Sequence, residues 1–262
     1  MTDTDNRYLV PALERGLRLL QLFSRERTEL TAPEIARELE LPRASVFRIV
    51  QTLEGMGFLE RHGNAYRLGP AVLRLGFEYL ASLELTEIAR PLIERLRDEA
   101  DSSAQLVVRD GREAVVVLKA ASPSMFASNV SVGTRFPAHA TILGRALLSE
   151  LDEDALKALF PESRLKAFSA NTPKTVAELK RLLAEDRKRG YVLSESFFER
   201  GISAIAAPVR DEQGAVVAAV STTVQRPTLD PKEYRERLVA LVVKAAADLS
   251  HRLNFRPERE AA

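Results

Sequence analysis

Apolar residues in the first third of the chain recur first at helical spacing and then in alternation with polar residues. Three helical stretches precede two short alternating stretches around a His-Gly-Asn turn, which predicts helices followed by a β-hairpin. Leu41-Pro42 separates the second and third stretches, because proline disfavours helical geometry at the residue before it. This order predicts a winged helix-turn-helix, which is a DNA-reading fold. The predicted helices span 11–24, 31–39 and 42–55, and the predicted strands span 58–61 and 65–68.

The rest of the chain combines helical and strand patterns. A helical stretch at 70–83 is apolar on more than one face, so we expect a linker helix that also takes part in a dimer contact. Beyond it, strands joined by turns such as Asp110-Gly111 alternate with helices, which predicts an α+β fold with helices packed on a mixed sheet. The predicted helices here span 85–101, 138–150, 152–160, 175–189 and 231–253, and the predicted strands span 104–109, 114–120, 126–131, 204–210 and 216–223.

Composition narrows the class of protein. At 262 residues, with 45% hydrophobic and 29% charged residues, the chain is expected to form two soluble globular domains. Residues 1–7 are polar, and no apolar run is long enough to span a bilayer, so we expect a cytoplasmic protein without a membrane partner. The chain has no Cys, which excludes disulfides, thiolate metal sites and cysteine nucleophiles.

The third predicted helix carries the candidate base-reading residues. Arg can pair bidentately with guanine and Gln with adenine, so a helix bearing both suits a major groove. The alternative is a solvated amphipathic helix. The net charge is only +1, so DNA affinity must come from a locally placed basic face. Phe47 is either a DNA contact or, more commonly for an aromatic residue in a helix, part of the core. The candidate base-reading residues are Arg43, Ala44, Ser45, Phe47, Arg48 and Gln51, and the candidate phosphate-binding residues are Arg15, Arg61 and Arg67.

Long blocks of the sequence resemble the IclR family of bacterial transcription regulators. The blocks include LERGLRLLQLF, LTAPEIARELELPRASVFRIVQTLEGMGFLER and VGTRFPAHATILGRALLSEL, and the last is similar to the Pca and Pob-like branch that controls aromatic-acid catabolism. The resemblance implies a DNA-binding domain at 1–69, a linker and dimerisation helix at 70–84, and a GAF-like effector-binding domain at 85–262. It also implies three partners: a double-stranded DNA operator, a small-molecule effector, and further copies of the chain in a homodimer or a dimer of dimers.

The effector site is expected near the start of the predicted helix at 138–150, whose free amides can hold an anionic group. The resemblance places small residues before the motif's glycine, where this chain has Ile142 and Leu143. These changes indicate a less polar pocket, suited to an acid with an apolar or aromatic body. His139 is equally a ligand contact or a structural hydrogen-bonding residue. The candidate effector-binding residues are His139, Thr141, Ile142, Leu143, Ser194, Ala204, Ser221 and Thr223.

Catalytic motifs are not evident. The three His residues are at 62, 139 and 251, without metal-ligand spacing, and Gly201-Ile202-Ser203 lacks the second glycine of a nucleophile elbow. We therefore expect a sequence-specific DNA-binding regulator, not an enzyme, with no metal and no cofactor. The alternatives are a DNA-binding or architectural protein that takes no ligand, and a small-molecule enzyme.

Overall fold

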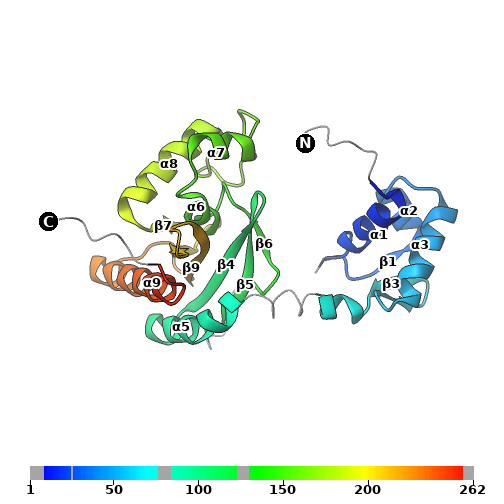
Figure 1. The fold of residues 1–262 in the computed structure, drawn as a ribbon, viewed down its shortest axis with the longest axis horizontal. Helices are drawn as coiled ribbons and strands as arrows, with labels where there is room; N and C mark the ends of the chain where they lie inside the picture. The colour runs from blue at the N-terminus through cyan, green and yellow to red at the C-terminus, as the bar shows by residue number, and fades with distance from the viewer. Residues whose placement is uncertain (1–8, 25, 76–83, 123–129, 256–262) are drawn as a thin grey trace. The chain divides into compact units, whose positions relative to one another are not determined.

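The computed structural model describes residues 9–24, 26–75, 84–122 and 130–255 (Figure 1). The chain divides into two compact units, Met1–Ser82 and Leu83–Ala262, each with its own core. In the described part of the chain, no helix combines the length and the apolar character needed to cross a membrane.

The first unit is a winged helix-turn-helix. Its helices are α1 (Pro11–Gln21), α2 (Ala32–Glu38) and α3 (Arg43–Gly55). The wing strands β2 (Leu59–His62) and β3 (Ala65–Leu68) form a hairpin, and the two-residue β1 (Leu30–Thr31) pairs with β3. The core is apolar, and its fully buried members include Leu19, Ile35 and Val46.

Helix α2 begins with a capping box. The Glu34 backbone N–H donates to the Thr31 hydroxyl, while the Thr31 N–H donates to the Glu34 carboxylate. The Thr31 hydroxyl also donates to the Glu34 carboxylate at 2.6 Å, and this bond, followed by the one from the Thr31 N–H, lowers the pKa of Glu34 below its usual 4.5. Pro42 is the N-cap of α3, and the helix proper begins one residue later than predicted. Of the predicted linker helix, residues 71–75 are helical, and 76–83 lie outside the described residues.

The second unit is built on a six-stranded antiparallel sheet in the order β6-β5-β4-β9-β8-β7. Two predicted strand pairs meet at its centre, where β4 pairs with β9. Its strands are β4 (Ser103–Asp110), β5 (Glu113–Ala120), β6 (Arg135–Pro137), β7 (Val192–Glu195), β8 (Ser203–Arg210) and β9 (Val216–Val224).

Helices cover both faces of this sheet (Figure 1). The long helices α5 (Glu84–Ala100) and α9 (Lys232–Arg252) pack against each other and against the central strands. On the other face, α6 (Ile142–Leu148) lies against β8 and β9, with α7 (Glu153–Leu159) and α8 (Val176–Arg189) beyond it. This arrangement is the α+β fold expected from the sequence, but the sheet is entirely antiparallel and not mixed, because its strands pair through hairpins and the antiparallel β4–β9 contact.

Two local predictions for this unit were wrong, and two edge strands were missed. Val130 and Ser131 are not in a strand; the rest of the strand predicted at 126–131 falls on 126–129, outside the described residues. The edge strands β6 and β7 were not predicted, because strands of three and four residues give too short an alternation. The helix expected at 138–150 begins only at Ile142, since the Thr141 hydroxyl accepts the Gly144 N–H as an N-cap.

Candidate functional site

The candidate base-reading residues lie on the surface of α3. Val46 and Val50 turn into the core, whereas Ala44, Phe47 and Gln51 are exposed. The exposed fraction of Phe47 is 60%, so the structure excludes its interpretation as a core residue. The Gln51 amide donates to the Glu54 carboxylate at 2.9 Å, within the same helix. This face therefore combines an exposed ring with a polar side chain.

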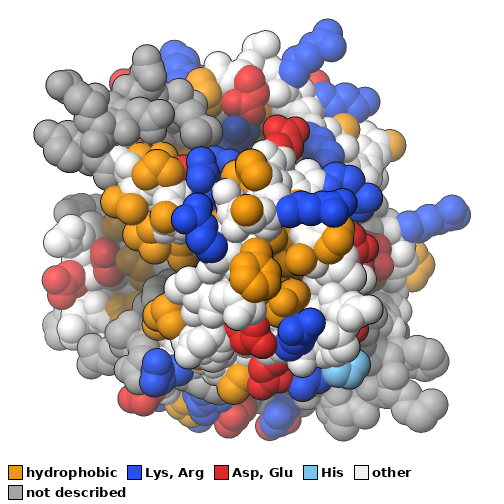
Figure 2. All heavy atoms as spheres, turned by 90° about the vertical axis from the view of Figure 1, so that its right-hand side faces the viewer, with side chains coloured by type: hydrophobic (Ala, Val, Ile, Leu, Met, Phe, Trp, Pro, Cys, Tyr) orange, Lys and Arg blue, Asp and Glu red, His pale blue; other side chains and the backbone are white. Residues whose placement is uncertain are grey.

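Part of the same residue set borders an apolar groove. The groove, of about 650 Å³, is lined by residues of α1, of α3 and of the chain on either side of the wing, and the lining includes Arg15, Ser45 and Arg48. Among the residues lining it, Leu13, Leu17, Met56 and Leu75 are more than half exposed. Figure 2 shows apolar side chains gathered between Lys and Arg side chains on the face that it draws. Sequence reasoning missed the groove, although Leu13 and Leu17 signal it by their helical spacing.

The wing presents the remaining arginines to solvent. Arg67 is paired with Glu60, with 2.8 Å between Nη2 and Oε2, and the Arg61 Nε donates to the Gly63 carbonyl. Gly63 has a φ of 60°, which a glycine adopts without steric cost at the hairpin tip. A phosphate contact by Arg67 would compete with this exposed ion pair, which costs little to break.

In the second unit, a cavity of about 100 Å³ lies between the start of α6 and the sheet. It brings together residues from distant parts of the sequence. Six of the eight candidate effector-binding residues line it: Thr141, Ile142, Leu143, Ser194, Ala204 and Thr223. His139 and Ser221 do not line it.

His139 has structural partners instead. Its Nε2 lies 2.9 Å from the Lys166 carbonyl oxygen, and its ring centroid lies 5.8 Å from the rings of both Phe160 and Phe168. The side chain is buried in this aromatic cluster. Of the two interpretations of His139, this geometry supports the structural one.

Ser221 is fully buried, and its hydroxyl has no hydrogen-bond partner among the described residues. Its neighbour on β4 is Gln105, which lines the cavity and is only 7% exposed. Within the described part of the chain, no hydrogen bond to the Gln105 amide is formed. Sequence reasoning missed Gln105, although a glutamine inside an apolar strand was a signal. It also missed Val130, Phe136, Phe198, Glu199 and Ile202, which complete the lining.

The cavity helix α6 is anchored by a buried ion pair. Arg145 donates from Nε and Nη2 to the two carboxylate oxygens of Asp186 on α8, each at 2.8 Å, and both residues are buried. Burial raises the pKa of Asp186, while Arg145 and Arg189 oppose that rise. The Arg145 guanidinium also lies 5.1 Å from the centroid of the Phe197 ring, in the β7–β8 connection.

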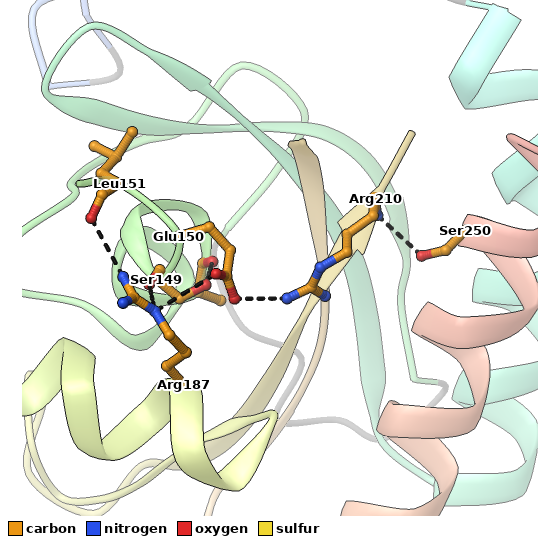
Figure 3. Close-up of polar contacts among 7 residues, drawn as sticks. Ser149, Glu150, Leu151, Arg187, Arg210 and Ser250 are labelled. Atoms are coloured by element: carbon orange, nitrogen blue, oxygen red, sulfur yellow. Dashed lines mark hydrogen bonds and ion pairs between the residues drawn. The ribbon is translucent and has the colours of Figure 1, made fainter. Parts of the chain in front are cut away.

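A second network holds the far end of α6 (Figure 3). The Arg187 guanidinium on α8 donates to the carbonyl oxygens of Ser149 and Leu151, which follow the helix. Glu150 accepts a hydrogen bond from Arg210 on β8 at 2.6 Å. With its middle and its far end fixed, α6 is expected to form a rigid wall of the cavity.

At the start of α6, the helix makes a close backbone contact. A Cβ on Gly144 would lie 2.1 Å from the Ala138 Cα, so any larger residue there would force the two segments apart. The glycine of the sequence motif is therefore explained by packing.

A winged helix-turn-helix joined to a separate α+β unit with a small cavity is typical of transcriptional regulators that combine a DNA-binding domain with an effector domain. Comparison with known families agrees with this class. Residues 12–63 match the IclR helix-turn-helix domain, and residues 77–251 match the family described as Bacterial transcriptional regulator IclR C-terminal. The chain belongs to the IclR family.

Characterised relatives cover nearly the whole chain. The Pca regulon regulatory protein of Pseudomonas putida is 31% identical over 243 residues, which is 92% of this chain and 84% of the relative. The transcriptional repressor AllR of Klebsiella pneumoniae is 28% identical, covering 95% and 92% of the two chains. These relatives and the matching family are transcriptional regulators. The chain is therefore a transcriptional regulator, and not the small-molecule enzyme that the sequence left as an alternative.

Solved structures agree in fold. An IclR-type regulator from Alicyclobacillus acidocaldarius has a TM-score of 0.82 at 28% identity, covering 94% of this chain and all of the other. An IclR homolog from Microbacterium hydrocarbonoxydans, solved in complex with 4-hydroxybenzoate, has a TM-score of 0.80 at 27% identity, covering 93% and 99%.

Proposed function

We propose that this regulator binds operator DNA through its winged helix-turn-helix, and that a small aromatic acid in the α6 cavity modulates that binding. The observation that carries the proposal is the cavity itself. It combines an apolar wall, from Ile142, Leu143 and Phe136, with hydroxyls from Thr141 and Thr223. Apolar walls with a few placed polar groups are typical of small-molecule sites.

Two relatives support the aromatic class. One is the Pca regulon regulatory protein, and the other is the homolog whose structure holds 4-hydroxybenzoate. The apolar Ile142 and Leu143 suit a ring better than they suit a very small, fully polar acid.

The small size of the cavity provides a means of coupling acid binding to a change in conformation. At about 100 Å³ it is smaller than the roughly 150 Å³ that holds a benzene ring in a designed cavity. Phe198, Glu199 and Ile202 line one side and come from the connection between β7 and β8. A bound ring would have to displace them, so it would favour a different conformation from the empty one. Such a difference in affinity between states is what a ligand needs to shift an equilibrium.

The test is a DNA-binding titration with and without acid. Anisotropy of labelled DNA from the gene's own upstream region would be measured with benzoate, 4-hydroxybenzoate and protocatechuate. We expect at least one acid to change the DNA affinity, and calorimetry should find the same factor in the acid's affinity when DNA is added. DNA binding that ignores an acid bound in the cavity would favour the alternative of a ligand-independent regulator.

We further propose that the DNA-bound form is a homodimer or a dimer of dimers on a two-fold symmetric site, since paired winged helices read paired half-sites. The exposed leucines of α1 support this proposal, because a second copy would cover them.

A further inference from the structure

A row of polar residues crosses the sheet beside the cavity. Gln105 on β4 is the register partner of Ser221 on β9 and of Lys119 on β5. Directly paired residues of antiparallel strands point to the same face. Along β4 and β9, this face also carries Val107 and Ala219, which pack in one core cluster with α6. The row therefore lies on the cavity side of the sheet.

Two members of the row hold unused hydrogen-bonding capacity. The Ser221 hydroxyl is fully buried without a partner among the described residues. Gln105 lines the cavity and is 7% exposed, and its side chain makes no hydrogen bond to the described residues. A buried polar group without a partner is costly and uncommon in native proteins. A ligand that accepts hydrogen bonds from both side chains would supply the partners that they lack and so would stabilise the bound state.

The third member supplies a positive charge. The Lys119 ammonium donates to the carbonyl oxygen of Val130, and Val130 lines the cavity. The row therefore ends in the Lys119 ammonium, which contacts a residue of the cavity wall. Among the residues lining the cavity, the charged side chain is Glu199, which is exposed and would repel an anion. Charge thus favours the Lys119 side for an anionic group.

The start of α6 is a weaker anion site than the sequence suggested. The helix has only seven residues, and Thr141 already accepts the Gly144 N–H. Ile142 and Leu143 contribute apolar side chains to the cavity wall.

We infer that the cavity, once a bound acid has enlarged it, extends along this row, so that Lys119, Gln105 and Ser221 hold the carboxylate and the ring lies against Ile142 and Leu143. This inference rests on the proposed function and specifies how the acid is held. The Gln105 amide and the Ser221 hydroxyl donate to the carboxylate oxygens, while Lys119 balances the charge.

The experiment is calorimetry on the full-length protein with 4-hydroxybenzoate and its neutral analogue 4-hydroxybenzamide. We expect Lys119→Met and Gln105→Leu each to weaken 4-hydroxybenzoate binding by about tenfold or more, the usual scale for a lost charged hydrogen bond. Lys119→Met should leave 4-hydroxybenzamide binding unchanged, whereas Lys119→Arg should retain most of the acid affinity. The matched controls are Lys157→Met and Gln213→Leu, at exposed positions away from the cavity.

The outcomes separate the two proposals. If 4-hydroxybenzoate changes operator binding but the row variants bind it as tightly as the wild type, the inference is overturned and the proposed function stands. Equal loss of acid and amide in Lys119→Met would also overturn it, because charge would not be the cause. If the wild type binds none of the three aromatic acids, both proposals fail. Should Gln105→Leu not fold, Ser221→Ala replaces it in the same comparison.

Discussion

At the scale of single residues, polar side chains in the second unit differ in whether their hydrogen bonds are made. Ser250 on α9 accepts the Arg210 N–H at 2.9 Å and donates to the Ala246 carbonyl. Ser221 is equally buried and bonds to nothing among the described residues. The Ser250 hydroxyl stabilises the fold. The Ser221 hydroxyl lowers the stability of the fold, and a role in binding the proposed effector would explain why it is present.

This contrast predicts opposite effects of one substitution. Without ligand, Ser221→Ala should raise the free energy of unfolding by about 1 kcal/mol, because a desolvated hydroxyl is removed. Ser250→Ala should lower it by about 1–2 kcal/mol, because the Arg210 N–H loses its acceptor. Urea unfolding followed by circular dichroism measures both. A loss of stability in Ser221→Ala as large as in Ser250→Ala would mean that the Ser221 hydroxyl has a partner.

At the scale of elements, α6 is held more firmly than a helix of seven residues could be by its own hydrogen bonds. The Arg145–Asp186 pair fixes it to α8, and the Arg187 contacts fix its far end. The helix can therefore serve as a fixed wall against which the β7–β8 connection adjusts.

The buried pair gives a prediction at this scale. Arg145→Met should lower the free energy of unfolding by about 3–5 kcal/mol, because it leaves the Asp186 carboxylate buried without its main partner. Arg145→Met combined with Asp186→Leu should recover most of the loss, since no buried charge remains. Denaturant unfolding of the single and double variants makes the comparison. A double variant no more stable than the single would show that shape, and not charge, sets the cost.

How much of the structure the sequence could predict also depends on the element. The helices and central strands were predicted because their apolar pattern continues over many residues, at helical spacing in α9 and as an almost continuous buried run in β8. The edge strands β6 and β7 escaped prediction because their pairing is fixed by the neighbouring strand and not by their own pattern. In the cavity, residues of the α6 motif were found, but Gln105 was not, since its position depends on β4 meeting β9 far along the chain.

At the scale of the whole molecule, the winged helix-turn-helix unit and the second unit have separate cores, and the first exposes an apolar surface. Leu13 and Leu17 of α1 are 61% and 53% exposed. Exposed apolar groups at this density are typical of contacts with another protein chain.

This surface predicts that assembly and operator binding fail together. Leu17→Glu should leave the fold intact, because the side chain is exposed, but should shift the protein towards monomer and weaken operator binding at least tenfold. Analytical ultracentrifugation and footprinting measure the two effects. The control is Val132→Glu, at an exposed position of the second unit. Unchanged assembly in Leu17→Glu would assign the dimer contact to another surface.

The pairing of β4 with β9 has a consequence for synthesis of the protein. More than a hundred residues of chain separate Gln105 from Ser221, so the centre of the sheet is a contact of high sequence separation. Such contacts form late, because a long loop must close before they are gained. The winged helix-turn-helix, by contrast, is complete within the first third of the chain and can fold as soon as it leaves the ribosome. A chain interrupted before β9 would therefore keep the winged helix-turn-helix but lack the strand that carries Ser221 and Thr223 beside the cavity. Under the proposed function, the DNA binding of such a chain would not respond to any acid.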